Sequence, residues 1–140
     1  MMRVKEIMSK DVKLIHPDAH LTDAAKLMRE KNIGMIPVGE DDRLEGVLTD
    51  RDIIIRALAK GKNLEDLTVR EVMTPKCQTC FEEDTIEEAS RHMSKDQIRR
   101  LAVLDKNNNV VGIISLGDLS AKGSDKEAAR ALHSISETKH

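Results

Sequence analysis

Aromatic side chains are almost missing from this chain of 140 residues: Phe81 is the only one, and there is no tryptophan or tyrosine. The hydrophobic core must therefore be aliphatic. Apolar residues make up 39% of the chain, which is enough for one compact core and argues against global disorder. Because rings for stacking are so scarce, a flat ligand would have to lie between aliphatic side chains and backbone.

Other features that are missing exclude further classes of protein. The 23 basic and 25 acidic residues are interspersed and give a net charge of −2, which argues against a nucleic-acid partner held by bulk positive charge. No apolar run approaches the roughly 18 residues of a membrane span, and no signal peptide is visible at the start. Two cysteines do not make a disulfide framework. We expect a soluble cytoplasmic protein without a membrane partner.

The chain contains the same pattern twice. VKEIM at residues 4–8 returns as VREVM at residues 69–73, a shift of 65 positions. A one-residue insertion then changes the shift to 66, which relates three further pairs: Gly46 and Gly112, Thr49 and Ser115, Asp52 and Asp118. Neither copy can bury its apolar face alone. We therefore predict two units that pack about a pseudo-twofold axis and leave a cleft between them.

Apolar spacing and turn residues predict the same order of elements in both copies, β-α-β-β-α after a short helix. In the first copy the expected helices cover residues 3–8, 21–31 and 50–60, and the expected strands cover residues 12–15, 35–38 and 44–48. In the second copy the expected helices cover residues 69–73, 86–94 and a stretch from 116, and the expected strands cover residues 77–81, 101–105 and 110–114. Gly34 is the expected helix C-cap, and Pro37 indicates a free strand edge or an irregular backbone. The fold class is α/β (α+β).

The repeat also predicts domain boundaries. The expected parts are a first domain with its short helix, a connector, a second domain and a helical tail, at residues 1–60, 61–68, 69–122 and 123–140. The tail includes an expected helix over residues 125–136 that has no counterpart in the first copy.

Three motifs in the first copy, and counterparts of the last two in the second, carry a resemblance to a known family. They are LTDAAKLM and NIGMIPV at residues 21–28 and 32–38, GVLTDRDI at 46–53, and QIRRLAV and GIISLGDL at 97–103 and 112–119. Their order and spacing resemble the CBS domain pair, or Bateman module, over about residues 3–121, and the chain looks most like the small stand-alone bacterial or archaeal members. The resemblance implies two tandem CBS domains and an adenosine-type ligand.

Thr49 and Asp52, and likewise Ser115 and Asp118, stand where a strand is expected to pass into a helix. A hydroxyl followed three residues later by an acid is a capping box, which stabilises a helix without any ligand. The same groups could bind a nucleotide, since a carboxylate can accept from both hydroxyls of a ribose. The resemblance favours the second interpretation: the matching Asp would hold the ribose, and the matching Thr or Ser would help to hold phosphate.

Arginines make the two copies unequal. Arg99 and Arg100 precede an expected buried strand and could bind phosphate bidentately, or form an ion pair on the surface. Arg51 is a similar candidate in the first copy. Its equivalent in the second copy is Gly117, which carries no charge. The resemblance implies that basic residues at these positions reach the phosphates of adenine nucleotides.

Aliphatic residues at the expected strand entries could form the walls of a base pocket, although plain core packing explains them as well. They are Met35, Ile36, Pro37, Leu101 and Ala102. Ala102 stands where the resemblance implies a proline, as kept at Pro37.

Cys77 and Cys80 are spaced like a redox pair. They fall on an expected strand, however, where an offset of three points the side chains to opposite faces, and no second pair completes a zinc site. Two packed thiols are the expected outcome.

The resulting hypothesis is a regulatory module that binds AMP, ADP or ATP in the cleft and signals to a separate effector protein. No cofactor is required. S-adenosylmethionine and NAD-type ligands share the ribose, but they lack the terminal phosphate that would use the arginines. The alternative is a structural module with vestigial pockets that forms a homodimer through its helices. No nucleophile–base pair, acid pair or metal cluster points to an enzyme.

Overall fold

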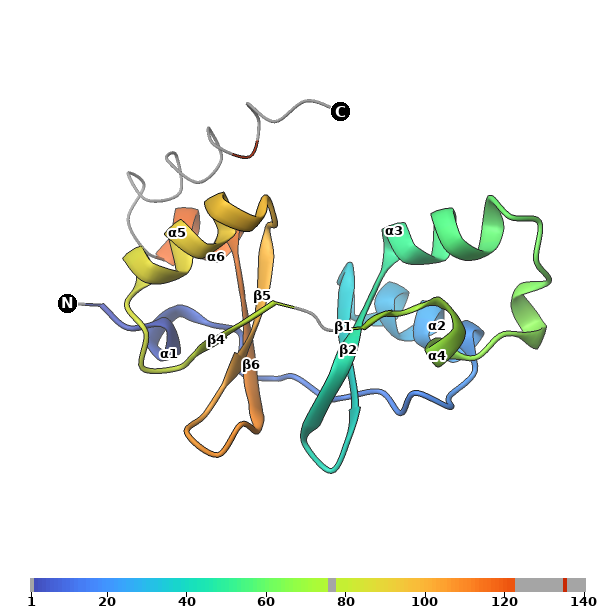
Figure 1. Ribbon diagram of the computed structural model, residues 1–140, viewed down its shortest axis with the longest axis horizontal. Coiled ribbons are helices and arrows are strands. Elements are labelled where there is room, and N and C mark those ends of the chain that lie inside the picture. Colours follow the sequence, from blue (N-terminus) through green and yellow to red (C-terminus); the bar gives the residue numbers. More distant parts are fainter. Residues whose placement is uncertain (1, 76–77, 123–134, 136–140) are drawn as a thin grey trace. The chain divides into compact units, whose positions relative to one another are not determined.

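The computed structural model describes residues 2–75, 78–122 and residue 135 (Figure 1). The chain divides into two compact units: residues 13–77 form one, and residues 1–12 together with those from 78 onward form the other. Each unit has one three-stranded sheet with helices packed on it. The predicted α/β class and tandem organisation are confirmed. The expected tail helix lies outside the described residues.

The unit of residues 13–77 contains an antiparallel sheet in the order β1-β2-β3. Its elements are α2 (Leu21–Lys31), β1 (Met35–Glu40), β2 (Arg43–Thr49), α3 (Asp50–Asp52), η1 (Ile53–Leu58), η2 (Leu64–Asp66), α4 (Val69–Val72) and β3 (Thr74–Pro75). Leu21, Ala24 and Met28 lie on one face of α2 and pack into an aliphatic core with Ile36 and Leu48 of the sheet.

Pro37 lies on the edge strand β1, as predicted. Ile15 makes an isolated parallel bridge on the outer side of this strand: its N–H donates to the Pro37 carbonyl at 3.0 Å, and its carbonyl accepts from Gly39 N–H at 3.0 Å. A residue's N and C=O point to the same side of a strand, so the nitrogen of Pro37 also faces this outer edge. The missing N–H therefore removes no bond between β1 and β2.

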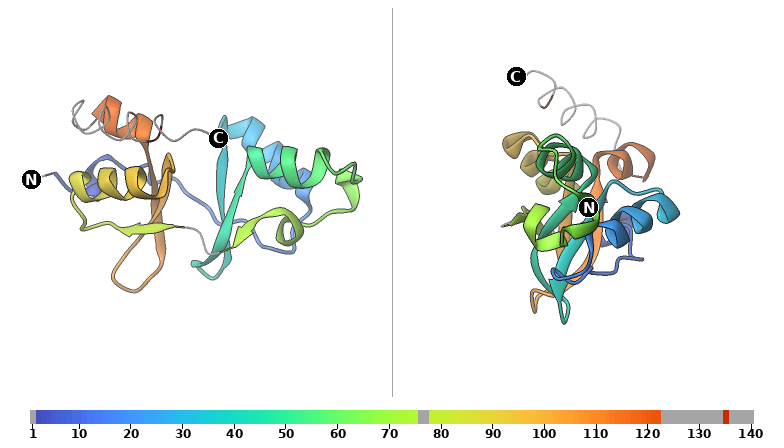
Figure 2. Two further views of the ribbon diagram at one scale, coloured as in Figure 1. Left: turned by 45° about the horizontal axis from the view of Figure 1, so that its top comes forward. Right: turned by 90° about the vertical axis from the view of Figure 1, so that its right-hand side faces the viewer.

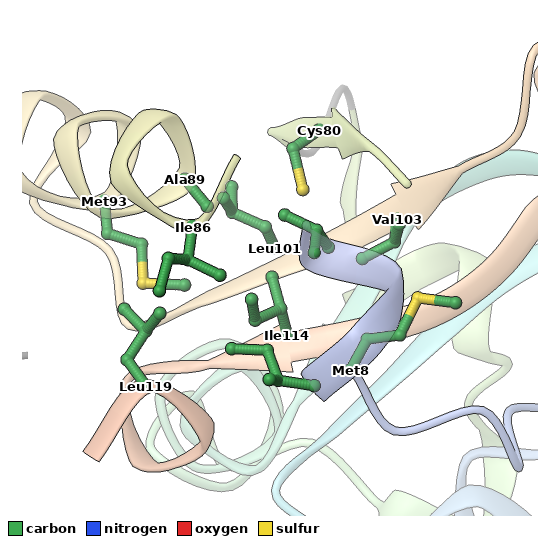
Figure 3. Close-up of a cluster of buried hydrophobic side chains, with 11 residues drawn as sticks. Met8, Cys80, Ile86, Ala89, Met93, Leu101, Val103, Ile114 and Leu119 are labelled. Carbon is green, nitrogen blue, oxygen red and sulfur yellow. The ribbon is translucent and has the colours of Figure 1, made fainter. Parts of the chain in front are cut away.

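The other unit contains the sheet β4-β5-β6, with β4 parallel and β6 antiparallel to β5. Its elements are α1 (Val4–Ile7), β4 (Thr79–Phe81), α5 (Ile86–Asp96), β5 (Arg100–Leu104), β6 (Val110–Ser115) and α6 (Leu116–Lys122). Helices α5 and α6 lie side by side (Figure 2). Figure 3 shows the aliphatic core, in which Met93 and Leu119 from these helices meet Leu101 and Ile114 from the strands.

The packing units exchange their short helices relative to the sequence repeats. Helix α1 opens the first repeat but packs with the second, where Val4 N–H donates to the Asp84 carbonyl at 2.8 Å. Helix α4 opens the second repeat but packs with the first, where Val69 N–H donates to the Ala19 carbonyl at 2.9 Å. Each three-stranded unit therefore contains the short helix that the sequence repeat assigned to the other domain.

The structure differs from the sequence predictions at several places: for example, η2 and β3 were not predicted. Of residues 12–15 only Ile15 pairs with a strand. The C-cap of α2 is Asn32 and not Gly34: Asn32 has a φ of 53° and takes the left-handed conformation that asparagine tolerates. The helix after β2 becomes π-helical, because Ala59 N–H donates to the Ile54 carbonyl five residues back at 2.7 Å. Within the described part of the chain, no helix is long and apolar enough to cross a membrane.

Candidate functional site

Four of the predicted site residues gather at one end of the β5–β6 hairpin. Arg100 is opposite Ser115 in the ladder, and Leu116 N–H donates to the Arg99 carbonyl at 2.9 Å. Asp118 follows in the first turn of α6. The strand pairing therefore brings Arg99, Arg100, Ser115 and Asp118 together, although the two halves of the set are 15 or more positions apart in the sequence.

Ser115 and Asp118 form the predicted capping box. Asp118 N–H donates to Ser115 Oγ at 3.1 Å, and Ser115 N–H donates to Asp118 Oδ2 at 2.9 Å. The capping interpretation is thus confirmed for this pair. It uses only one carboxylate oxygen, since Asp118 Oδ1 has no hydrogen-bond partner among the described residues. Asp118 is half-buried, so this oxygen can accept from a ligand.

The first repeat has the same backbone arrangement. Met35 is opposite Thr49, and Asp50 N–H donates to the Gly34 carbonyl at 3.1 Å. Thr49 and Asp52 form the equivalent capping box, with both hydrogen bonds at 3.0 Å. Gly34 and Met35 occupy the places that Arg99 and Arg100 hold in the second repeat, so this end of the hairpin carries no cation at the strand entry.

Asp52 has two further neighbours that the sequence reasoning missed. Thr74 Oγ1 donates to Asp52 Oδ1 at 3.0 Å, and the Arg56 Nε lies 3.8 Å from the same oxygen. Arg56 also donates from Nη1 to the Met73 carbonyl at 2.8 Å. Arg56 could have been found from its i+4 spacing to Asp52. Thr74, 22 positions away, gave no signal of this kind.

Three predicted phosphate-binding arginines are exposed. The side chains of Arg51, Arg99 and Arg100 have no hydrogen-bond or ion-pair partner in the ranges that the structure describes. Each guanidinium group therefore keeps its donors for an anion. Arg51 uses only its backbone N–H, which donates to Asp50 Oδ1 at 2.8 Å.

The five predicted wall residues are all buried. Ile36 and Leu101 belong to the aliphatic cores of their units, so their side chains are committed to packing. Met35, Pro37 and Ala102 lie outside those cores, because neighbouring residues of a strand point to opposite faces. Of the five, only these three side chains are candidates for contact with a base.

The Cys80 thiol is buried in the core of its unit (Figure 3). Burial, and to a smaller extent the negative charge of Asp84, raises the pKa of this thiol to about 12. A group that stays protonated is a poor nucleophile and metal ligand, which fits a packed thiol. Cys77 lies outside the described residues. Within those residues, no cluster of three or more His, Cys, Asp or Glu side chains could hold a metal ion.

Comparison with known proteins identifies the family. The CBS domain model matches the chain twice, at residues 4–58 and 69–124. The chain belongs to the CBS domain family. The CBS domain-containing protein YhcV of Bacillus subtilis is 41% identical to it over 137 residues, which cover 97% of this chain and 96% of the relative.

Solved structures of CBS proteins match the fold of this CBS domain pair. A conserved CBS domain protein of unknown function from Thermoplasma acidophilum, TA0289, superposes with a TM-score of 0.84 at 28% identity, over 99% of this chain and 79% of that one. The CBS domain pair of protein MJ0100 gives a TM-score of 0.79 at 31% identity, over 90% and 98%. That pair was solved in complex with 5′-methylthioadenosine and S-adenosyl-L-methionine. CBS domain pairs are ligand-sensing regulatory modules, and this chain has their architecture.

Proposed function

We propose that this CBS domain pair binds an adenine nucleotide, AMP, ADP or ATP, and signals its presence to a separate effector protein. The observation that supports the proposal is the position of Asp118 and Ser115 beside Arg99 and Arg100 at one end of the β5–β6 hairpin. This set combines an acceptor for hydroxyl groups with two guanidinium groups for phosphate.

Each part of a nucleotide has a matching group. The two hydroxyls of a ribose can donate to Asp118, whose Oδ1 has no partner among the described residues. Arg99 and Arg100 are exposed and can donate to phosphate oxygens as charge-assisted pairs. A base would rest on aliphatic surface and on backbone groups, since Phe81 is the only aromatic residue.

The first repeat contributes a second, weaker set of candidates. It consists of Thr49, Arg51 and Asp52 in the same order. Met35 stands where the second repeat has Arg100, and Pro37 stands where it has Ala102. Arg51 is exposed and can meet an anion. Because no arginine stands at its strand entry, this set provides less positive charge for phosphate than the set around Asp118.

Titration calorimetry with the full chain tests the proposal. We expect ATP or AMP to bind, and the double change Arg99→Gln and Arg100→Gln to weaken binding by about tenfold or more, because each lost charge-assisted hydrogen bond contributes roughly 1.5–3 kcal/mol. Arg91→Gln, an exposed arginine on α5, is the matched control and should leave the affinity unchanged. Absence of binding by the unaltered protein at millimolar AMP, ADP and ATP would overturn the proposal.

S-adenosylmethionine and NAD-type ligands can be tested with the same variants. Both carry the ribose that Asp118 would hold, and the MJ0100 pair is a relative with S-adenosylmethionine bound. Neither has a terminal phosphate. If S-adenosylmethionine is the ligand, the Arg99→Gln and Arg100→Gln changes should leave its affinity nearly unchanged while Asp118→Asn weakens it. An NAD-type ligand carries an anionic diphosphate, so both kinds of variant should weaken its binding.

A second candidate function, a homodimerisation module, rests on the exposed apolar face of η1. Ile54, Ile55 and Leu58 are 53%, 47% and 59% exposed, which is unusual for three large apolar residues within one helical turn. We expect light scattering to give a dimer, and Ile54→Ser with Leu58→Ser to give a monomer. A dimer that binds no nucleotide would favour this function over the sensor.

A further inference from the structure

We infer that the two equivalent aspartates do different work: Asp118 is the acceptor for the ribose, whereas Asp52 is a positioning residue that holds Thr74 of β3 beside β2. The part that concerns Asp118 rests on the proposed nucleotide-binding function. The part that concerns Asp52 depends only on the hydrogen bonds within its own unit.

Both carboxylate oxygens of Asp52 are already used by the protein. Oδ2 accepts from Thr49 N–H at 3.0 Å, and Oδ1 accepts from Thr74 Oγ1 at 3.0 Å. The residue is only 8% exposed. A ribose would have to reach a buried carboxylate and displace the Thr74 hydroxyl from it. Each new hydrogen bond would replace an existing one, so the exchange gives little net affinity.

Arg56 strengthens the link between Asp52 and the segment after α4. Its Nε lies 3.8 Å from Asp52 Oδ1, and its Nη1 donates to the Met73 carbonyl at 2.8 Å. Asp52 and Arg56 therefore hold two consecutive residues of this segment, Thr74 by its side chain and Met73 by its backbone. The arrangement explains the burial of Asp52 without any ligand.

The equivalent contacts differ around Asp118. Ser9 occupies the place of Thr74, and its backbone pairs with Ile113 by two hydrogen bonds of 2.9 and 3.0 Å. The Ser9 side chain is exposed and has no hydrogen bond to Asp118. Asp118 thus keeps Oδ1 free of described partners. Arg99 and Arg100 lie in the same unit, so the open carboxylate and the two unpaired cations occur together.

Four variants of the full chain test the assignment, with ATP and AMP as probes in titration calorimetry and the melting temperature as a second measurement. Asp118→Asn keeps one acceptor for the capping box and removes the negative charge. Asp52→Asn is its counterpart in the first repeat. Thr74→Val removes the hydroxyl that binds Asp52, and Ser9→Val is the matched change in the second repeat.

We expect Asp118→Asn to weaken binding at least tenfold with little change in melting temperature. Asp52→Asn and Thr74→Val should change the affinity by less than about threefold, and Thr74→Val should lower the melting temperature by about 3–6 °C. Ser9→Val should change neither quantity. Wild-type binding that survives Asp118→Asn and is lost in Asp52→Asn would overturn the assignment while leaving the proposed function intact.

The remaining outcomes are also decisive. Failure of the unaltered protein to bind either nucleotide would overturn the proposed function together with the role of Asp118. The role of Asp52 would then be decided by melting temperature alone: equal values for Thr74→Val and Ser9→Val would overturn it. Should Asp52→Asn fail to fold, Thr74→Val carries the same test.

Discussion

Gly46 on β2 lies so close to Thr74 on β3 that an ideal Cβ on the glycine would stand 2.4 Å from the Thr74 carbonyl oxygen. The contact follows from the ladder, in which Gly46 is opposite Pro75. Gly112 has the same relation to Ser9 within the other unit, since a Cβ on Gly112 would stand 2.8 Å from the Ser9 carbonyl oxygen. Both repeats therefore need glycine where the chain leaving a short helix crosses the sheet.

Gly46→Ala is expected to destabilise the protein by about 1–3 kcal/mol, because the obstacle is a backbone atom that cannot turn away. Urea unfolding followed by circular dichroism measures this loss. Gly117→Ala is the control: its added methyl would meet only Ser115 Oγ at 3.5 Å, on a helix where alanine is favoured. The prediction is wrong if both variants unfold at the same urea concentration.

The N-caps of the two long helices predict opposite effects of mutation. Thr85 Oγ1 accepts from Glu88 N–H at 3.1 Å at the start of α5, whereas His20 makes no side-chain cap at the start of α2. Thr85→Ala should cost about 1 kcal/mol, and His20→Thr should add about 0.5–1 kcal/mol by forming a box with Asp23. Urea midpoints measure both changes, and a loss of stability in His20→Thr would contradict the prediction.

The same cap gives a dependence on pH. Hydrogen bonds from the backbone N–H and hydroxyl of Thr85 hold the pKa of Glu88 below its usual 4.5. A lowered carboxyl pKa stabilises the folded state above the unfolded pKa, and this contribution is lost as the pH falls through the folded value. The difference in stability between wild type and Thr85→Ala should therefore shrink as the pH is lowered from 6 toward about 3.

The elements with local signals could be predicted from the sequence. Helix α2 has the bounds Leu21–Lys31 that its apolar spacing predicted, and the capping boxes followed from three-residue spacings. Only the C-cap of α2 was misplaced, because Asn32 and Gly34 both tolerate a left-handed conformation, and spacing alone does not choose between them. The exchange of α1 and α4 depends on contacts more than 45 positions apart, such as that of Val4 with Asp84, which no local pattern encodes.

The candidate site divides in the same way. Ser115 and Asp118 were predictable because they lie within one turn, and the repeat placed Arg99 and Arg100 at the neighbouring strand entry. The hydrogen bond from Thr74 to Asp52 could not be predicted, because it depends on β3 joining the sheet of the first repeat. The repeat made the two aspartates look equivalent, and only their three-dimensional neighbours distinguish them.

Asn32 should be replaceable by glycine with a gain in stability. Its φ of 53° is left-handed, a region where an L side chain is strained and glycine is not. We expect Asn32→Gly to add about 0.5–1 kcal/mol. Glu30→Gly, two residues earlier within the helix, is the control and should cost about 1 kcal/mol. Equal losses in both variants, measured as urea midpoints, would show that Asn32 contributes more than its backbone conformation.

The buried thiol of Cys80 predicts a loss of stability at alkaline pH. Its pKa is raised from 9.0 to about 12, so between these values the unfolded chain loses a proton that the folded chain keeps, and stability falls as the pH rises. At pH 10 the loss should be about 1 kcal/mol relative to pH 8. No tyrosine titrates in this range, because the chain has none.

The measurement compares urea midpoints of Cys77→Ser with those of Cys77→Ser plus Cys80→Ala at both pH values, since lysine titration is common to the two proteins. The loss should be smaller in the double variant by the stated amount, and equal losses would mean that Cys80 is already ionised or accessible in the folded state.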